Sequence, residues 1–127
     1  MQPKNQKTLS EFTIACTNIR SLCPEGKKAE LKLHTITKVK ADIHIIVDSR
    51  LDESGLKKWK KTQKKLMSRF DIFGNFSKDR GVTIIVKKAI GVTISNVEKI
   101  DVKNTVLFRL TTSAGTETDI CAVYAPS

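Results

Sequence analysis

The first half of the chain combines short apolar runs with one stretch of helical spacing. Residues 12–17 are mostly apolar and β-branched, which predicts a first strand. Within residues 27–40 the apolar side chains recur every three or four positions, which predicts a helix with one stripe facing a sheet. Residues 43–47 form a near-continuous apolar run bounded by charge, as in a central strand covered on both faces. This order is typical of a βαβ crossover and leaves the direction of strand pairing open.

The second half begins with a helical pattern and then changes to strands. Residues 56–67 place apolar side chains on one stripe and six lysines on the opposite face. From residue 70 onward the pattern predicts five strands, at residues 70–76, 81–87, 92–100, 106–112 and 119–124. Their short connections predict hairpins and antiparallel pairing. The whole pattern predicts an α/β fold with one mixed sheet and two main helices packed on it.

Composition places the chain among globular proteins, with 39% apolar residues in a length of 127. We assign residues 12–127 to one domain and the polar residues 1–11 to a flexible lead-in. No apolar run approaches the ~18 residues that a membrane span needs. The first ten residues also lack the apolar core of a signal peptide. These features predict an intracellular, soluble protein with no segment that spans a membrane.

The cysteines Cys16, Cys23 and Cys121 form neither a disulfide framework nor a zinc pattern, because their number is odd and no CxxC pair occurs. Cys16 and Cys121 lie within predicted strands, where a thiol is usually buried. We therefore predict buried structural thiols in a reducing compartment.

The chain is strongly basic, with 23 Lys and Arg against 13 Asp and Glu, a formal net charge of +10. Such a surface concentrates polyanions, which makes nucleic acid the leading partner and an anionic membrane the second. The lysine face of residues 56–67 offers Lys57, Lys58 and Lys61 as contacts to a DNA backbone. The alternatives are a solvated helix face for these lysines and solubility for the net charge.

Polar side chains stand where three apolar runs end: Asn18, Asp48 and Tyr124. An α/β scaffold presents its sites at such a rim of the sheet. A carboxylate there is a natural Mg²⁺ ligand because this hard ion prefers oxygen. The alternatives for Asp48 are a solvated strand-end residue and a helix cap. Asp52 and Glu53 lie close enough in sequence to substitute for it, or they form an exposed acidic turn.

Four short motifs carry a family resemblance. In chain order they read TNIRSL from Thr17, VDSRL from Val47, RGVTIIV from Arg80 and VYAPS from Val123. In order and spacing they resemble the first half of the endonuclease/exonuclease/phosphatase superfamily, the fold of exonuclease III and DNase I. In particular they resemble the endonuclease domain of LINE-type non-LTR retrotransposons. The resemblance implies the first half of a DNase I-like four-layer α/β sandwich.

The resemblance also implies roles for individual residues. Asn18 would line the active site near the scissile phosphate, and Tyr124 would stabilise the charge that develops there. Asp48 would hold Mg²⁺ or Mn²⁺, although the family pattern has Glu at this position and Gln before it. Asp is one methylene shorter, and Mg²⁺ requires ligand distances of ~2.1 Å. Three arginines would contact nucleic-acid phosphates through their planar forks: Arg20, Arg50 and Arg80.

The chain ends immediately after the tyrosine motif, where the family pattern is half complete. No segment matches the Asp-x-Asn pair or the late Ser-Asp-His motif that the family uses for hydrolysis. The resemblance therefore implies a truncated domain that is inactive alone. It also implies a first sheet whose inner face lacks a partner, which predicts self-association or docking of the missing C-terminal half.

These observations lead to a functional hypothesis: part of a metal-dependent DNA endonuclease that nicks a target site for retrotransposition. Its partners would be DNA and a reverse transcriptase, and its location would be the nucleus. One alternative is a catalytically inert remnant that only binds nucleic acid. Another is a fragment of a phosphatase of the same superfamily.

Overall fold

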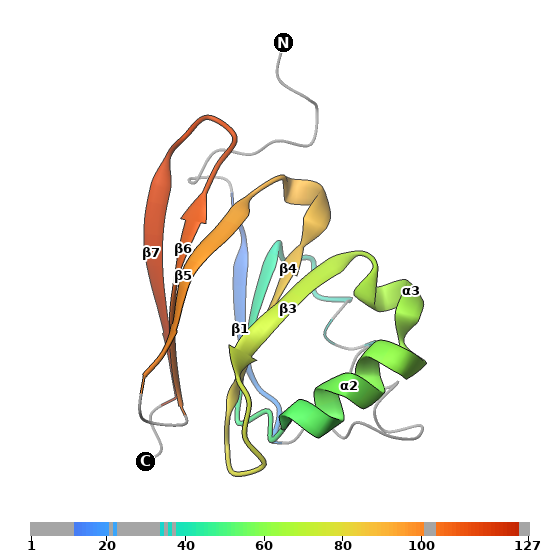
Figure 1. Cartoon of the computed structure of the whole chain (residues 1–127). Helices are drawn as coiled ribbons and strands as arrows, with labels where there is room; N and C mark the ends of the chain where they lie inside the picture. The colour runs from blue at the N-terminus through green and yellow to red at the C-terminus, as the bar shows by residue number, and fades with distance from the viewer. Residues whose placement is uncertain are drawn as a thin grey trace.

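The strands form two sheets, as the computed structural model of the chain shows for residues 12–20, 22, 34, 36, 38–100 and 104–124 (Figure 1). The first sheet has the order β1-β2-β4-β3. Its strands are β1 (Ile14–Asn18), β2 (Ile43–Val47), β3 (Phe70–Asn75) and β4 (Val82–Lys87). The second sheet has the order β5-β6-β7, with strands β5 (Thr93–Lys99), β6 (Thr105–Thr111) and β7 (Glu117–Val123). The fold is therefore mixed α/β and rich in strands.

The prediction of a single mixed sheet is wrong, because β5 does not join β4. Both edges of β4 are already occupied, one by β2 and the other by β3. The 3₁₀ turn η2 (Lys88–Ile90) ends at Gly91, whose φ of 68° redirects the chain. As a result β5 pairs with β6 and starts a second layer. The predicted antiparallel pairing holds for β3 with β4, β5 with β6 and β6 with β7.

Strands β1 and β2 pair in parallel, the point that the sequence pattern left open. Their register runs from Ile14 opposite Ile43 to Asn18 opposite Val47. The carboxyl ends of the two strands therefore meet at one edge of the sheet, with Asp48 directly beyond it. Of the predicted helix at residues 27–40, the described residues 34, 36 and 38 are helical, and the rest lies outside the described residues. The predicted lead-in, residues 1–11, and Cys23 also lie outside them.

The main core lies between the two sheets. Ile43 and Ile45 of β2 and Ile84 of β4 pack against the side chains of Phe108 and Leu110 on β6. The rings of Phe73 and Phe108 meet edge to face across this interface, with centroids 5.0 Å apart. The expectation of an uncovered inner face is therefore wrong, because the second half of the chain supplies the covering sheet. The reason for expecting self-association is removed with it.

A helix covers the other face of the first sheet. Helix α2 (Glu53–Thr62) packs Leu56 and the fully buried Trp59 into a cluster with Ile46 and Ile85 of the sheet. The predicted helix at residues 56–67 is thus confirmed in a different form, since it begins earlier and breaks at Gln63 before the single turn α3 (Lys64–Met67). Its lysines are exposed: Lys57, Lys58, Lys60, Lys61, Lys64 and Lys65. Among the described residues, no helix is long and apolar enough to cross a membrane.

Asp52 begins helix α2 as its N-cap. Its Oδ1 accepts a hydrogen bond of 2.8 Å from the backbone N–H of Gly55. This bond is the main reason why the pKa of Asp52 lies below its ordinary value, and the positive charge of Lys78 lowers it further. Asp52 therefore serves the helix, so the idea that it substitutes for Asp48 in holding a metal is not supported by its geometry.

The outer face of the second sheet carries charge. Arg109 on β6 bonds to Asp119 on β7, with 2.8 Å between Nε and Oδ1, and reaches Glu117 at 3.5 Å. Such cross-strand ion pairs are typical of a sheet face in contact with water. The described residues therefore form three layers, a helix layer, the first sheet and the second sheet, as Figure 1 shows from right to left.

The prediction of buried cysteines is wrong for the two that the structure describes. Cys16 lies on β1 and Cys121 on β7, and both side chains are exposed. Each of these strands forms the edge of its sheet. On β7, Ala122 packs into the core, so its neighbour Cys121 faces outward. A strand-like sequence therefore does not by itself indicate that both of its faces are covered.

The fold predicts a severe effect of adding one methyl group at Gly74 on β3. A Cβ there would lie 2.2 Å from the backbone oxygen of Val82, which cannot move without disrupting the β3–β4 pairing. We expect Gly74→Ala to lower the free energy of unfolding by about 3 kcal/mol, the upper end of overpacking effects. The matched control is Gly115→Ala, where no atom lies within 4 Å and only the positive φ costs about 1 kcal/mol. Equal denaturant midpoints for the two variants would contradict this account.

Burial of His44 predicts a dependence of stability on pH. His44 on β2 is 3% exposed, and its Nε2 has no hydrogen-bond partner among the described residues. Its pKa lies below the ordinary 6.5, because burial and the charge of Lys87 outweigh the opposing effects of the Ala41 backbone and Asp42. The unfolded chain therefore binds the proton first as the pH falls below 6.5, and the free energy of unfolding decreases there.

The measurement is urea unfolding on both sides of that pH. His44→Leu should flatten the pH profile, because the neutral side chain has no proton to gain on unfolding. His34→Gln, a change at the exposed histidine, should keep the wild-type profile. A His44→Leu profile as steep as that of the wild type would show that another group causes the dependence.

Candidate functional site

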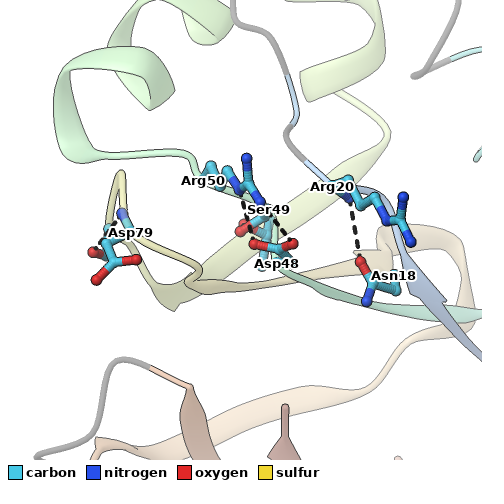
Figure 2. Close-up of polar contacts among 8 residues, drawn as sticks. Asn18, Arg20, Asp48, Ser49, Arg50 and Asp79 are labelled. Atoms are coloured by element: carbon cyan, nitrogen blue, oxygen red, sulfur yellow. Dashed lines mark hydrogen bonds and ion pairs between the residues drawn. The ribbon is translucent and has the colours of Figure 1, made fainter. Parts of the chain in front are cut away.

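The candidate site lies where three neighbouring strands of the first sheet have ends on the same edge. Strands β1 and β2 end there, and the antiparallel β4 begins there. Figure 2 shows Asn18 at the end of β1 and Asp48 at the end of β2, side by side along this rim. Tyr124 follows β7 of the second sheet. A cleft of about 530 Å³ opens at this edge, lined by Asp48, Arg50, Lys78, Asp79, Arg80 and Tyr124.

The turn from Asp48 to Arg50 is held firmly on both sides. The backbone N–H groups of Ser49 and Arg50 donate to the carbonyl oxygens of Gly81 and Arg80, at 3.2 and 2.6 Å. On the other side, the Leu22 N–H donates to the carbonyl of Ser49 at 2.6 Å. The Ser49 side chain is fully buried, and its hydroxyl accepts a 3.0 Å hydrogen bond from Thr83 on β4. These bonds fix the backbone that carries the Asp48 and Arg50 side chains.

The backbone at this rim is conformationally strained. Five non-glycine residues of the described chain have positive φ, and four of them lie here: Arg20, Asp48, Arg50 and Arg80. The fifth, Asn96, lies within the register shift of β5. The left-handed region costs a non-glycine residue about 1–2 kcal/mol. Such costs are concentrated at functional sites, where the surrounding structure holds the residue in place.

Asp48 and Arg50 form a two-pronged ion pair (Figure 2). Arg50 Nε lies 3.0 Å from Oδ1 of Asp48, and Nη2 lies 3.2 Å from Oδ2. The Asp48 side chain is 7% exposed, whereas that of Arg50 is 50% exposed. The hydrogen bond and the negative charge of Asp48 raise the pKa of Arg50 above its ordinary value. The carboxylate that the sequence proposed as a metal ligand therefore already has a cationic partner within its own motif.

Asn18 and Arg20 lie beside the cleft rather than in its lining. The Asn18 Oδ1 accepts a 3.3 Å hydrogen bond from the backbone N–H of Arg20, which closes a local turn after β1. Both side chains are exposed. The structure thus brings Asn18 to the same edge as Asp48 while its carboxamide oxygen binds its own backbone.

Tyr124 reaches the cleft from the second sheet. Its backbone N–H donates to the Asn104 carbonyl at 2.9 Å, and its partly buried ring packs against the core between the sheets. The predicted residues Asp48, Arg50, Arg80 and Tyr124 therefore share one cleft. The predicted DNA contacts on α2 are not among the residues that line it.

Sequence reasoning missed Lys78 and Asp79 as lining residues. They belong to the loop between β3 and β4, and Lys78 also lies 3.6 Å from Asp52 at the start of α2. Gly81 closes this loop with a φ of 77°, and a Cβ there would lie 3.0 Å from the carbonyl oxygen of Ser77. Gly81 is therefore part of the hairpin connection between β3 and β4. The sequence does show polar residues directly before the Arg-Gly motif, which could have indicated that Lys78 and Asp79 belong to the site. Their position beside Asp48, however, depends on the pairing of β4 with β2.

The donor set fits a divalent cation in part. Oxygen ligands suit Mg²⁺, which commonly binds one or two carboxylates together with substrate phosphates. Asp48 supplies one such carboxylate, and both of its oxygens already accept hydrogen bonds from Arg50. Among the described residues, however, no group of three or more His, Cys, Asp or Glu side chains forms a metal cluster. A metal at Asp48 would therefore depend on the release of Arg50 and on oxygens from a bound ligand.

The remaining charge of the cleft favours an anion. The lining holds three cationic side chains, Arg50, Lys78 and Arg80, and two carboxylates, Asp48 and Asp79. Outside the lining, Asp52 also lies 3.6 Å from Lys78. A guanidinium group binds two oxygens of a phosphate through the same planar fork that it presents to a carboxylate. The arrangement is therefore suited chemically to hold a phosphate group at the strand ends.

Comparison with known proteins adds no assignment. No protein-family model matches the chain, and no curated protein sequence matches it significantly.

Proposed function

We propose that the cleft binds a phosphodiester of DNA and that the chain is part of a Mg²⁺-dependent DNA-nicking endonuclease of the endonuclease/exonuclease/phosphatase superfamily. One observation carries this proposal. Asn18, Asp48 and Tyr124 come from three distant segments, and at one edge of the sheets Asp48 and Tyr124 line the cleft while Asn18 lies beside it. The resemblance that singled them out used no spatial information. The four-layer sandwich and the partnership with a reverse transcriptase belong to the same proposal.

Each residue has a task in this proposal. Arg50 and Arg80 bind phosphate oxygens through their planar forks, and Lys78 adds a third positive charge. Tyr124 donates its hydroxyl to a phosphate oxygen as negative charge develops, and Asn18 orients the adjoining strand end. When bound, a metal held by Asp48 supplies positive charge to the phosphate in the transition state.

A second candidate function is nucleic-acid binding without cleavage. The observation in its favour is the ion pair that occupies both oxygens of Asp48. With that pair intact, the cleft still offers Arg80 and Lys78 to a phosphate backbone. The two candidates therefore share a binding step and differ in the need for a metal.

Nicking of supercoiled plasmid tests the endonuclease. In the endonuclease of which this chain is proposed to be part, we expect Mg²⁺-dependent conversion to the open circle, lost on addition of EDTA and in Asp48→Ala, because both remove the metal from the phosphate. Lys38→Ala, an exposed lysine of the helical region before β2, is the control that keeps activity. Nicking by Asp48→Ala at the wild-type rate would exclude the proposed role of Asp48. Absence of nicking together with tight DNA binding would favour the second candidate.

Salt dependence tests the binding step that both candidates share. We expect the affinity for a fluorescent DNA duplex in EDTA to fall linearly with salt on a double logarithmic plot. Arg80→Gln should weaken binding and reduce the slope by about 1, the loss of one phosphate contact. Arg69→Gln removes the same charge at the opposite end of β3 and should leave the slope unchanged. Binding that does not weaken with salt would exclude a phosphate-backbone site.

The same measurement decides whether the lysine face takes part. If DNA extends from the cleft along α2, joint replacement of Lys57, Lys58 and Lys61 by Gln should reduce the slope by about 3. If only the cleft binds DNA, the slope should match that of the wild type, which would assign these exposed lysines to a solvated helix face.

A further inference from the structure

We propose that Arg50 and a divalent cation compete for the Asp48 carboxylate, and that a phosphate bound in the cleft favours the cation by drawing Arg50 away. This inference rests on the proposed function, since it concerns regulation of the same site. Its geometric basis is the two-pronged pair, in which Nε and Nη2 of Arg50 lie 3.0 and 3.2 Å from the two carboxylate oxygens.

The carboxylate cannot serve both partners in full. A Mg²⁺ ion requires an oxygen at ~2.1 Å and near-ideal octahedral geometry around itself. Both oxygens of Asp48 already accept hydrogen bonds from Arg50, and only 7% of its side chain is exposed. An incoming cation would also stand next to the guanidinium and be repelled by its charge. Without a ligand in the cleft, the resting state of the site is therefore the Arg50 pair.

Arg50 is the partner that can leave. Its side chain is half exposed, whereas Asp48 is buried. The backbone of the turn is pinned by the bonds of Ser49 to Gly81 and of Arg50 to Arg80. The guanidinium can therefore rotate into the cleft while the carboxylate and the backbone stay in place.

A phosphate supplies the reason for Arg50 to move. The phosphate offers the Arg50 guanidinium two oxygens in place of the two carboxylate oxygens of Asp48. Lys78 and Arg80, which line the same cleft, also attract the phosphate. Removal of Arg50 leaves Asp48 as a buried carboxylate without its ion-pair partner, which is strongly unfavourable. A divalent cation relieves that cost. Phosphate and metal should therefore bind with positive coupling, and linkage requires each to strengthen the other.

Titration with Mn²⁺ alone tests the competition without nucleic acid. By calorimetry, Arg50→Gln should bind Mn²⁺ about tenfold more tightly than the wild type, a coupling of ordinary size. Arg50→Lys keeps the charge but not the fork, and should fall between the two. The double variant Asp48→Asn/Arg50→Gln should lose the gain. Arg69→Gln, which removes an arginine away from the cleft, should match the wild type.

Circular dichroism will verify that each variant is folded, and Arg50→Lys preserves the test if Arg50→Gln is not. Equal Mn²⁺ affinity in the wild type, Arg50→Lys and Arg50→Gln would overturn the proposal. So would a gain that persists in the Asp48→Asn/Arg50→Gln variant, because the metal would then bind elsewhere.

A second titration tests the role of the phosphate. Mn²⁺ binding to the wild type is measured with a saturating thymidine dinucleotide, after subtraction of Mn²⁺ binding to the dinucleotide alone. We expect an affinity about tenfold higher than without it, and little change in Arg50→Gln, where the competitor is already gone. No enhancement in the wild type would overturn the coupling. Failure of the proposed function appears separately, as DNA binding in EDTA that is insensitive to salt and to Arg80→Gln.

Discussion

The pairing of the central strands is the constraint on which the rest of the structure depends. Strand β2 has β1 in parallel on one side and β4 antiparallel on the other. This arrangement brings two strand ends and one strand start to a single edge, so Asn18, Asp48 and Arg80 become neighbours. Together with the pairing of β3, it occupies both edges of β4, so β5 does not pair with β4.

The second sheet stabilises the site as well as the fold. Its side chains bury the inner face of the first sheet, and its last strand delivers Tyr124 to the cleft. The apolar contacts of this core offset the cost of holding Asp48 and Arg50 in the left-handed region. Ser49, buried and bonded to Thr83, connects that strained turn to the core. The rigidity of the rim is thus a property of the packed sheets and not of the turn sequence.

Electrostatics links the rim to function. A buried carboxylate needs a positive partner, and Asp48 finds one two residues away in Arg50. The same requirement makes Asp48 a candidate metal ligand, because either Arg50 or a metal ion can supply the positive charge. A phosphate bound in the cleft would be a third partner, because it can bind Arg50 in place of Asp48. The proposed endonuclease and the simple nucleic-acid binder differ in which of these partners Asp48 holds.

The sequence by itself determined the local elements. Strand periodicity predicted the seven strands of the described residues to within a few residues, and apolar spacing predicted the helix that buries Trp59. The three candidate residues at strand ends were also visible, because a change from apolar to polar marks where a strand leaves the core.

Only the tertiary structure decided how these elements share space. It settled the parallel pairing of β1, the division into two sheets and the exposure of Cys16 and Cys121. It also decided that Arg50 holds Asp48 and that Lys78 lines the same cleft. The physical reason is that periodicity records which side of an element is apolar, while edge pairing and ion pairing depend on neighbours that are distant in the chain.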